Sequence, residues 1–370
     1  IQRGVMYRMK LDTNATRLGF QRLDPASCDS NKYMWMNPLE MDRNDDNIIY
    51  WAEGNKLWRN NDLSSIIYNG SHQKSDLGWT MFSDTLPNPN MKISVITSSV
   101  NPANILYFGT QNKHIYRVDN ANVGDPALVQ LANVPTGSSS YCTDVAVNPD
   151  NADEIIIVYS NYSVYSLFHS NDGGQSWTKI AGNLEQNLSG SGNGPSCRTA
   201  EIIPLGNDTL YLVGTTVGLF GTANLDGTNT IWEQIGSNTF GSTIIEYLTY
   251  RPSDGLLVVG TFGNGVYQTN LTSIDDVLAV ENIKTSAFEF NIYPNPVVSK
   301  INIDLLGNKK SVSAILIYDD LGRIVKRVSR NNFQKSANNI QVDVQGLKSG
   351  IYFVSLSIDG EQLTRQIIKK

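Results

Sequence analysis

The sequence predicts an all-β protein in two parts, and three observations support this. Charged residues make up only 17% of the 370-residue chain. Tyr, Asn, Ser, Thr and Gly are abundant instead, and this mixture favours short strands and polar turns. A strand–turn pattern recurs through residues 1–271, and the last part of the chain alternates between apolar and polar residues. The first part is expected to be a β-propeller, and the second a small antiparallel β-sandwich.

Five segments of the first part share one plan. Each has an apolar strand ending at a proline, a polar turn, a β-branched or aromatic strand, a Gly or Asn turn, and an aromatic-containing strand. The prolines, 47 to 64 residues apart, are Pro38, Pro102, Pro149, Pro204 and Pro252. Three further strands centre on Trp79, Trp177 and Trp232. Four short strands per unit at this period are typical of propeller blades, and a proline suits a strand end.

The number of blades follows from the strands at each end of this pattern. GVMYRMKLD and RLGFQRLDP fit two strands of a further unit, and the last unit has three strands. We therefore expect one partial blade, four complete blades and a three-stranded blade, from a propeller of six to seven blades. Because the chain opens in mid-pattern at Ile1, it is expected to be the C-terminal part of a longer precursor whose upstream residues close the ring.

Composition and spacing exclude several functions. The net charge of −6 gives no electrostatic reason to expect nucleic acid as a partner. No apolar run approaches the roughly 20 residues that span a bilayer. The three histidines are scattered and C-x-x-C is absent, so no metal or other cofactor is expected. Cys142 and Cys197 each lie seven residues before a proline. A disulfide between them and a pair of buried thiols both fit this spacing.

One stretch of the repeat region, SNDGGQSW, fits the pattern S-x-D-x-G-x-x-W and resembles the Asp-box of the sialidase-like (BNR-repeat) propellers. Asp172 can accept backbone N–H bonds across a tight turn in which glycines supply positive φ. In the families that carry it, the box lies on the rim of a blade, away from the active site. The resemblance covers roughly residues 1–270 and implies structural roles for Ser170, Asp172, Gly174 and Trp177.

The innermost strand of each blade faces the central channel, and its polar residues are the candidates for contact with a ligand. They are Asp144, Arg198, Glu201 and Glu246. Xyloglucanases with Asp-boxes use two carboxylates across a cleft, so the catalytic candidates are Asp144, Glu201 and Glu246. Hydrated charges that face the channel are the expectation for these residues. The arginine triad and Arg-Ile-Pro signature of sialidases are absent. We expect a non-catalytic propeller with a glycan or protein ligand, and a glycoside hydrolase is the alternative.

Several aromatic side chains could either stack on sugar rings or pack between blades, and packing is the expectation. They are Trp35, Trp51, Trp58, Tyr116, Tyr162 and Tyr165.

The repeat stops after residue 271, a linker is expected at 272–287, and a separate domain at 288–370. About six or seven segments of this domain place apolar residues two apart, as strands with one buried face do. DLGR and IDGEQ have the composition of turns between such strands. The domain is therefore expected to be a small Ig-like antiparallel sandwich.

Four ordered blocks of this domain resemble the type A sorting domain of the type IX secretion system. They are YPNP, IYDDLGRIV, GLKSGIYFVSLSIDG and a lysine-containing last strand. The prolines are expected to fix the entry of the first strand, and the glycines to permit turns. The residues concerned are Pro294, Asn295, Pro296, Gly322, Gly350, Tyr352, Arg365, Lys369 and Lys370.

This resemblance implies a cargo protein of Bacteroidetes-type bacteria, which crosses the periplasm and then the outer membrane through a translocon β-barrel. An outer-membrane shuttle barrel receives it, and a sortase-like protease commonly removes the domain. The product is secreted or held at the cell surface. The last strand would be the recognition element, with exposed groups near Arg365, Lys369 and Lys370 as contacts. The sequence leaves open whether the barrel reads it by strand addition or by insertion into a pocket.

Overall fold

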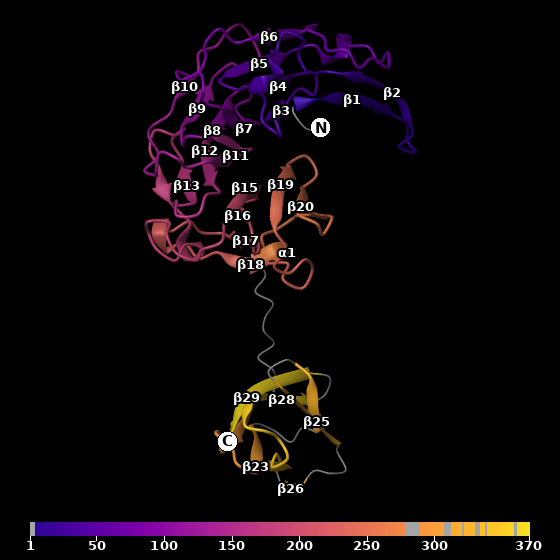
Figure 1. Ribbon diagram of the computed structural model, residues 1–370, viewed down its shortest axis with the longest axis vertical. Coiled ribbons are helices and arrows are strands. Elements are labelled where there is room, and N and C mark those ends of the chain that lie inside the picture. The colour runs from indigo at the N-terminus through magenta and orange to yellow at the C-terminus, as the bar shows by residue number, and fades with distance from the viewer. Residues whose placement is uncertain are drawn as a thin grey trace. The chain divides into compact units, whose positions relative to one another are not determined.

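The computed structural model describes residues 4–278, 289–306, 312–319, 322–329, 334–336, 339–358 and 361–370. The chain divides into two compact units, Ile1–Ala279 (unit 1) and Val280–Lys370 (unit 2) (Figure 1). Antiparallel strands dominate both units, so the prediction of an all-β protein is confirmed. Helical structure in the described residues is limited to α1 (Asp275–Leu278) and short 3-10 turns, and none of these helices has the length and apolarity needed to cross a bilayer.

The described part of unit 1 contains a two-stranded sheet, four four-stranded sheets and a three-stranded sheet, each built from consecutive strands. The first two sheets comprise β1 (Tyr7–Leu11), β2 (Arg17–Arg22), β3 (Leu39–Met41), β4 (Ile49–Glu53), β5 (Lys56–Asn60) and β6 (Trp79–Met81). The next two comprise β7 (Ile93–Ser98), β8 (Leu106–Thr110), β9 (Ile115–Val118), β10 (Val129–Gln130), β11 (Cys142–Asn148), β12 (Asn151–Tyr159), β13 (Leu167–Ser170) and β14 (Thr178–Lys179). The last two comprise β15 (Cys197–Leu205), β16 (Asp208–Thr215), β17 (Gly218–Thr222), β18 (Glu233–Ile235), β19 (Ile245–Arg251), β20 (Leu256–Thr261) and β21 (Val266–Asn270).

Successive sheets of unit 1 follow one another along an arc, from β1–β2 in indigo to β19–β21 in orange (Figure 1). The first strands of neighbouring sheets lie side by side, in the order β3, β7, β11, β15 and β19. The middle strands β4 and β8 are buried on both faces, and in β12 every residue of the run Ile155–Tyr159 is fully buried. Sheets covered on both faces explain the continuous apolar runs of the sequence.

The first strands share a β-bulge. In β7, β11, β15 and β19 the pairing register shifts after the first residue, which leaves one extra residue on the inner strand. The extra residues are Ser94, Thr143, Arg198 and Glu246. A bulge places two consecutive side chains toward the same region and re-aims them.

All three cysteines are free and buried, so the structure has no disulfide between Cys142 and Cys197. Cys142 occupies space left by Gly109 of the neighbouring sheet, where a Cβ would lie only 2.8 Å from the Cys142 Cβ. Burial raises the pKa of both Cys142 and Cys197, which keeps them as inert thiols. The alternative of small buried thiols therefore describes this pair.

Three of the repeat prolines do not directly end a strand. Pro102 lies four positions beyond Ser98, the last residue of β7. Pro38 precedes β3, which begins at Leu39, and Pro204 lies within β15, opposite Thr209. Pro149 and Pro252 directly follow β11 and β19, as predicted. Proline is tolerated before a strand, after a strand or at the unpaired edge of one. A proline therefore indicates a nearby strand but does not show which end of the strand it occupies.

Unit 2 consists of two four-stranded antiparallel sheets, β22-β23-β27-β26 and β25-β24-β28-β29. The strands are β22 (Glu289–Tyr293), β23 (Lys300–Leu306), β24 (Val312–Tyr318), β25 (Ile324–Ser329), β26 (Gln334–Ser336), β27 (Asn339–Asp343), β28 (Gly350–Ile358) and β29 (Glu361–Lys369). One apolar core joins the inner faces of the two sheets, with Phe290, Ile301, Ile317 and Leu356 all fully buried.

Candidate functional sites

The turn between β13 and β14 is organised by the Asp172 carboxylate. Its Oδ1 accepts hydrogen bonds from Ser170 Oγ at 2.7 Å and from the backbone N–H groups of Gln175 and Ser176 at 2.9 and 3.0 Å, and its Oδ2 accepts one from Ser176 Oγ. These bonds, led by the one from the Ser176 hydroxyl, lower the pKa of Asp172 to about 2. Trp177 donates its indole N–H to the carbonyl of Ala132, which follows β10 of the preceding sheet, at 2.9 Å. The group therefore holds a turn and ties two sheets together.

Replacement of this carboxylate tests its role. Asp172→Ala is expected to lower the free energy of unfolding by about 1–2 kcal/mol, as the loss of a carboxylate that satisfies backbone N–H groups does at helix caps. Because the pKa of Asp172 is lower in the folded chain than in the unfolded chain, its contribution is present above about pH 4 and is lost as the pH falls toward about 2. Urea unfolding across this range measures the difference, and Asn171→Ala, an exposed neighbour, is the control. A difference that does not change with pH would contradict the assignment.

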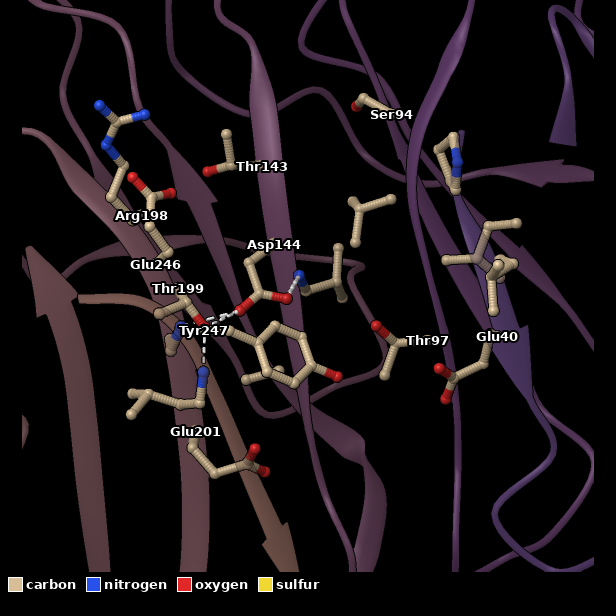
Figure 2. Close-up of a pocket in the computed structure, with 18 of the residues that line it drawn as sticks. Glu40, Ser94, Thr97, Thr143, Asp144, Arg198, Thr199, Glu201, Glu246 and Tyr247 are labelled. Carbon is tan, nitrogen blue, oxygen red and sulfur yellow. Dashed lines mark hydrogen bonds between the residues drawn. The ribbon is translucent and has the colours of Figure 1, made fainter. Parts of the chain in front are cut away.

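The first strands of unit 1 enclose a cavity of about 320 Å³. All four candidate residues, Asp144, Arg198, Glu201 and Glu246, line it (Figure 2). The extra residues of the bulges line it too, so that neighbouring pairs such as Arg198 and Thr199 both face the cavity. No group of three or more His, Cys, Asp or Glu within the described ranges is placed to hold a metal ion.

The Asp144 carboxylate is occupied by protein groups. Its Oδ2 accepts hydrogen bonds from the Thr199 hydroxyl at 2.7 Å and from the Ala200 N–H at 2.9 Å, and its Oδ1 accepts one from the Val145 N–H at 2.8 Å (Figure 2). Burial raises the pKa of Asp144 despite these bonds. Asp144 therefore joins β11 to β15, and its lone pairs are largely committed to that link.

Glu40, Arg43 and Glu201 line the same cavity. Arg43 Nε is 3.5 Å from Glu40 Oε1. Glu201 is only 3% exposed, and burial, assisted by the charge of Asp144, raises its pKa to about 8 although Arg43 opposes the shift. Glu201 is therefore protonated at neutral pH and can donate a hydrogen bond.

The sequence did not single out Glu40, Arg43 or Tyr247 as cavity residues. Glu40 and Arg43 follow Pro38, which was expected to end a strand, so they were assigned to the turn beyond it. If the strand had been predicted to begin after Pro38, as β3 does, Glu40 would have been predicted to face the channel with the other acids.

The raised pKa of Glu201 has a measurable consequence. A carboxyl whose pKa is about 8 in the folded chain and about 4.3 in the unfolded chain binds its proton more tightly when folded. Wild type therefore loses stability as the pH rises from about 4 to about 8. Glu201→Gln does not titrate, so its free energy of unfolding, relative to wild type, should increase across this window. Urea unfolding at several pH values measures it, and Thr143→Ala, at a residue of the same cavity whose side chain does not titrate, is the control.

Most of the aromatic candidates are part of the core. Trp51, Trp58, Tyr116 and Tyr165 are at most 7% exposed, whereas Trp35 and Tyr162 are 61% and 66% exposed. The Tyr247 ring lies among the cavity residues and is also largely exposed (Figure 2).

In unit 2, the YPNP segment lies beside the last strand. Asn295 Nδ2 donates to the Gln366 carbonyl at 3.0 Å, and its Oδ1 accepts from the Ile368 N–H at 2.8 Å. Pro294 and Pro296 flank this residue between β22 and β23. The first and last blocks of the sequence pattern are therefore joined by hydrogen bonds.

The other sorting residues divide into turn, core and surface positions. Gly322 adopts φ +74° in the turn before β25, where its N–H donates to the Asp319 carbonyl. Tyr352 is buried and donates its hydroxyl to the Lys348 carbonyl at 3.0 Å. Gly350 differs from the expectation of a turn, because it is the first residue of β28 and pairs with Lys369.

The three cationic residues near the C-terminus also differ from one another. The Arg365 guanidinium lies 5.6 Å from the centre of the Phe290 ring, and Lys370 is exposed. Lys369 is only 7% exposed, so it is not the exposed cation that was expected. It shares the inward side of β29 with Ile367, two residues before it, which accounts for its burial.

The two sheets of unit 2 and its hydrogen-bonded last strand define a C-terminal β-domain appended to a larger all-β unit. Residues 291–370 match the family of secretion system C-terminal sorting domains. This match indicates a type IX secretion cargo that is exported across the outer membrane to the cell surface or the medium. No curated protein matches the chain in sequence.

Solved structures similar to this chain include PorZ, a surface component of the type IX secretion system of Porphyromonas gingivalis. The identity is 13% and the TM-score 0.40, over 99% of this chain and 58% of the PorZ chain. Raptor of Chaetomium thermophilum is 9% identical with a TM-score of 0.40, over 91% of this chain and 29% of its own. The computationally designed Ika8 protein is 10% identical with a TM-score of 0.35, over 96% and 75% of the two chains.

Proposed function

We propose that unit 1 is the passenger of this exported chain and is a β-propeller of the Asp-box kind, with six to seven blades in the intact protein. The observation that carries the proposal is the repetition in unit 1. Four-stranded sheets follow one another, their first strands lie side by side around one cavity, and four of these strands carry a bulge at the same position. The hydrogen-bonded turn at Asp172 supports the Asp-box assignment.

The passenger's proposed role is to bind a glycan or protein ligand without catalysis. Two of the three carboxyl groups considered for catalysis are poorly suited to it. Asp144 is engaged by three hydrogen bonds, and Glu201 is 3% exposed. The cavity instead offers exposed groups for binding, with Met36 82% and Tyr247 61% exposed, and the exposed acid Glu246 lies on the same strand as Tyr247. Aromatic and carboxylate side chains in a concave site suit a polar ligand.

For unit 2, we propose residues 288–370 as the sorting domain and a linker within 272–287. The first part of that range belongs to unit 1, because α1 packs against β17 and β18. The partners would be the translocon β-barrel and the outer-membrane shuttle barrel, with removal by a sortase-like protease. The turn and core positions of Gly322 and Tyr352 support an Ig-like sandwich as the recognised element.

A glycoside hydrolase is the second candidate, because one observation favours it. A glycosidase needs one protonated carboxyl group at neutral pH, and the pKa of Glu201 is raised to about 8. The secreted full chain would be applied to a glycan array and assayed for reducing-sugar release from polysaccharides. Binding without sugar release is expected. Sugar release that disappears in Glu246→Gln would favour the hydrolase.

A further inference from the structure

The outer edge of β29 is paired with the segment that follows β22. Besides the two hydrogen bonds of the Asn295 side chain, the Val297 N–H donates to the Ile368 carbonyl at 2.8 Å and the Lys370 N–H donates to the Val297 carbonyl at 2.9 Å. Val297 and Lys369 form a parallel β-bridge. The Val297 side chain is fully buried, so this segment is anchored in the core of unit 2.

These hydrogen bonds limit how the export machinery can recognise β29. Addition of a strand from a partner needs unpaired N–H and C=O groups along an edge. β29 is the edge strand of its sheet, but from Gln366 to Lys370 its outward groups are bonded to residues 295–297. Strand addition over this stretch would first have to displace a segment held by four hydrogen bonds and a buried valine.

The same end of unit 2 presents exposed apolar side chains. Ile351 and Ile368 are directly opposite each other on β28 and β29, and each is 45% exposed. Their neighbours Tyr352 and Ile367 point into the core, so the isoleucine pair lies on the outward face of the sheet. Val298, next to the paired segment, is 66% exposed, and the exposed Lys370 adds a positive charge.

We propose that the secretion machinery recognises this end of unit 2 through its side chains, as a surface formed by Val298, Ile351, Ile368 and Lys370, and does not add a strand to residues 366–370. The partner would be a component of the machinery with an apolar pocket bordered by acidic groups. Asn295 is a positioning residue that holds β29 against the rest of this surface. The proposal rests on the sorting-domain assignment of residues 291–370.

The test uses the full chain behind a cleavable signal peptide, in a bacterium with a type IX system, with secreted and periplasmic protein quantified by immunoblot. The double variant Ile351→Ser/Ile368→Ser should reduce secretion at least about tenfold, as truncation of central interface residues does. Ile324→Ser, 40% exposed on β25 at the opposite edge of the same sheet, should stay within about twofold of wild type. Wild-type secretion of the double variant would overturn the proposal.

Asn295 separates the two modes of recognition. Asn295→Ala removes two of the four hydrogen bonds that cover the edge of β29, those to the Gln366 carbonyl and the Ile368 N–H. Strand addition therefore predicts equal or increased secretion, whereas a side-chain surface predicts a reduction of at least about tenfold. Asn302→Ala, which removes a hydrogen bond to the Tyr293 carbonyl away from β29, is the matched control. Resistance to proteolysis in the periplasm shows whether Asn295→Ala is folded. If this variant is degraded there, the secretion of Ile351→Ser/Ile368→Ser decides whether the proposal holds. Secretion of a chain that lacks residues 361–370 would refute the sorting assignment itself, which is a separate outcome.

Discussion

Deletion of Glu361–Lys370 is expected to abolish secretion of the chain while unit 1 stays folded. These residues form β29 and pair with β28 along its whole length, from Gly350 opposite Lys369 to Ile358 opposite Glu361. Ile367 is fully buried in the core of unit 2, and the backbone of β29 holds Asn295 and Val297. Without the strand, the edge of β28 and part of the core are exposed to water, so the recognised surface is lost.

The chain provides its own control for this deletion, because all six tryptophans lie in unit 1, the last of them at residue 232. Tryptophan fluorescence during urea unfolding therefore reports unit 1 and should be the same for the full and the truncated chain. Immunoblots should find the truncated chain in the periplasm, with at least about tenfold less in the medium and at the cell surface. Normal secretion would contradict the sorting role of unit 2, and a shifted fluorescence transition would contradict independent folding of unit 1.

The sequence predicted the features that depend on local pattern. Alternation of apolar residues predicted the strands of unit 2, and the turn at Gly322 follows from glycine chemistry. The all-β class followed from composition and strand period. The four polar candidates line one cavity because the first strands of the repeat lie side by side.

Features that depend on register and long-range pairing were not predicted. A bulge shifts the alternation by one residue, so Arg198 and Thr199 both face the cavity although they are neighbours in sequence. The hydrogen bonds of Asn295 to β29 connect residues more than seventy positions apart, and no local pattern encodes them. Lys369 lies on the inward side of β29 with Ile367, and its burial depends on the packing of that side within unit 2.

Exposure of aromatic residues is a second property that was not predicted, because packing was expected for all six and two of them are exposed. Trp35 and Trp51 belong to the same repeat segment, yet one is 61% exposed and the other 1% exposed. Both fit an aromatic strand or turn position. Only the packing of neighbouring sheets determines which of them enters the core.

Trp232→Ala is expected to cause the largest loss of stability among these variants. Trp232 is 2% exposed and belongs to the core shared by the sheets β11–β14 and β15–β18. Its indole N–H donates to the Ile180 carbonyl at 2.8 Å, and the Asn183 side chain bonds its backbone N–H and C=O at 2.8 and 3.0 Å. Truncation leaves a cavity and an unpaired carbonyl, so the free energy of unfolding should fall by about 3–5 kcal/mol.

Trp35→Ala is the matched control for this variant, since it removes the same side chain from a position that is 61% exposed. Its effect should stay within about 0.5 kcal/mol, the usual range for surface substitutions. Far-UV circular dichroism during urea unfolding measures both variants without depending on the tryptophan that was removed. A loss below about 1 kcal/mol for Trp232→Ala would mean that the site collapses around the missing ring. The contact between the two sheets would then contribute little to the stability of unit 1, and its neighbouring sheets would be held together mainly by their first strands.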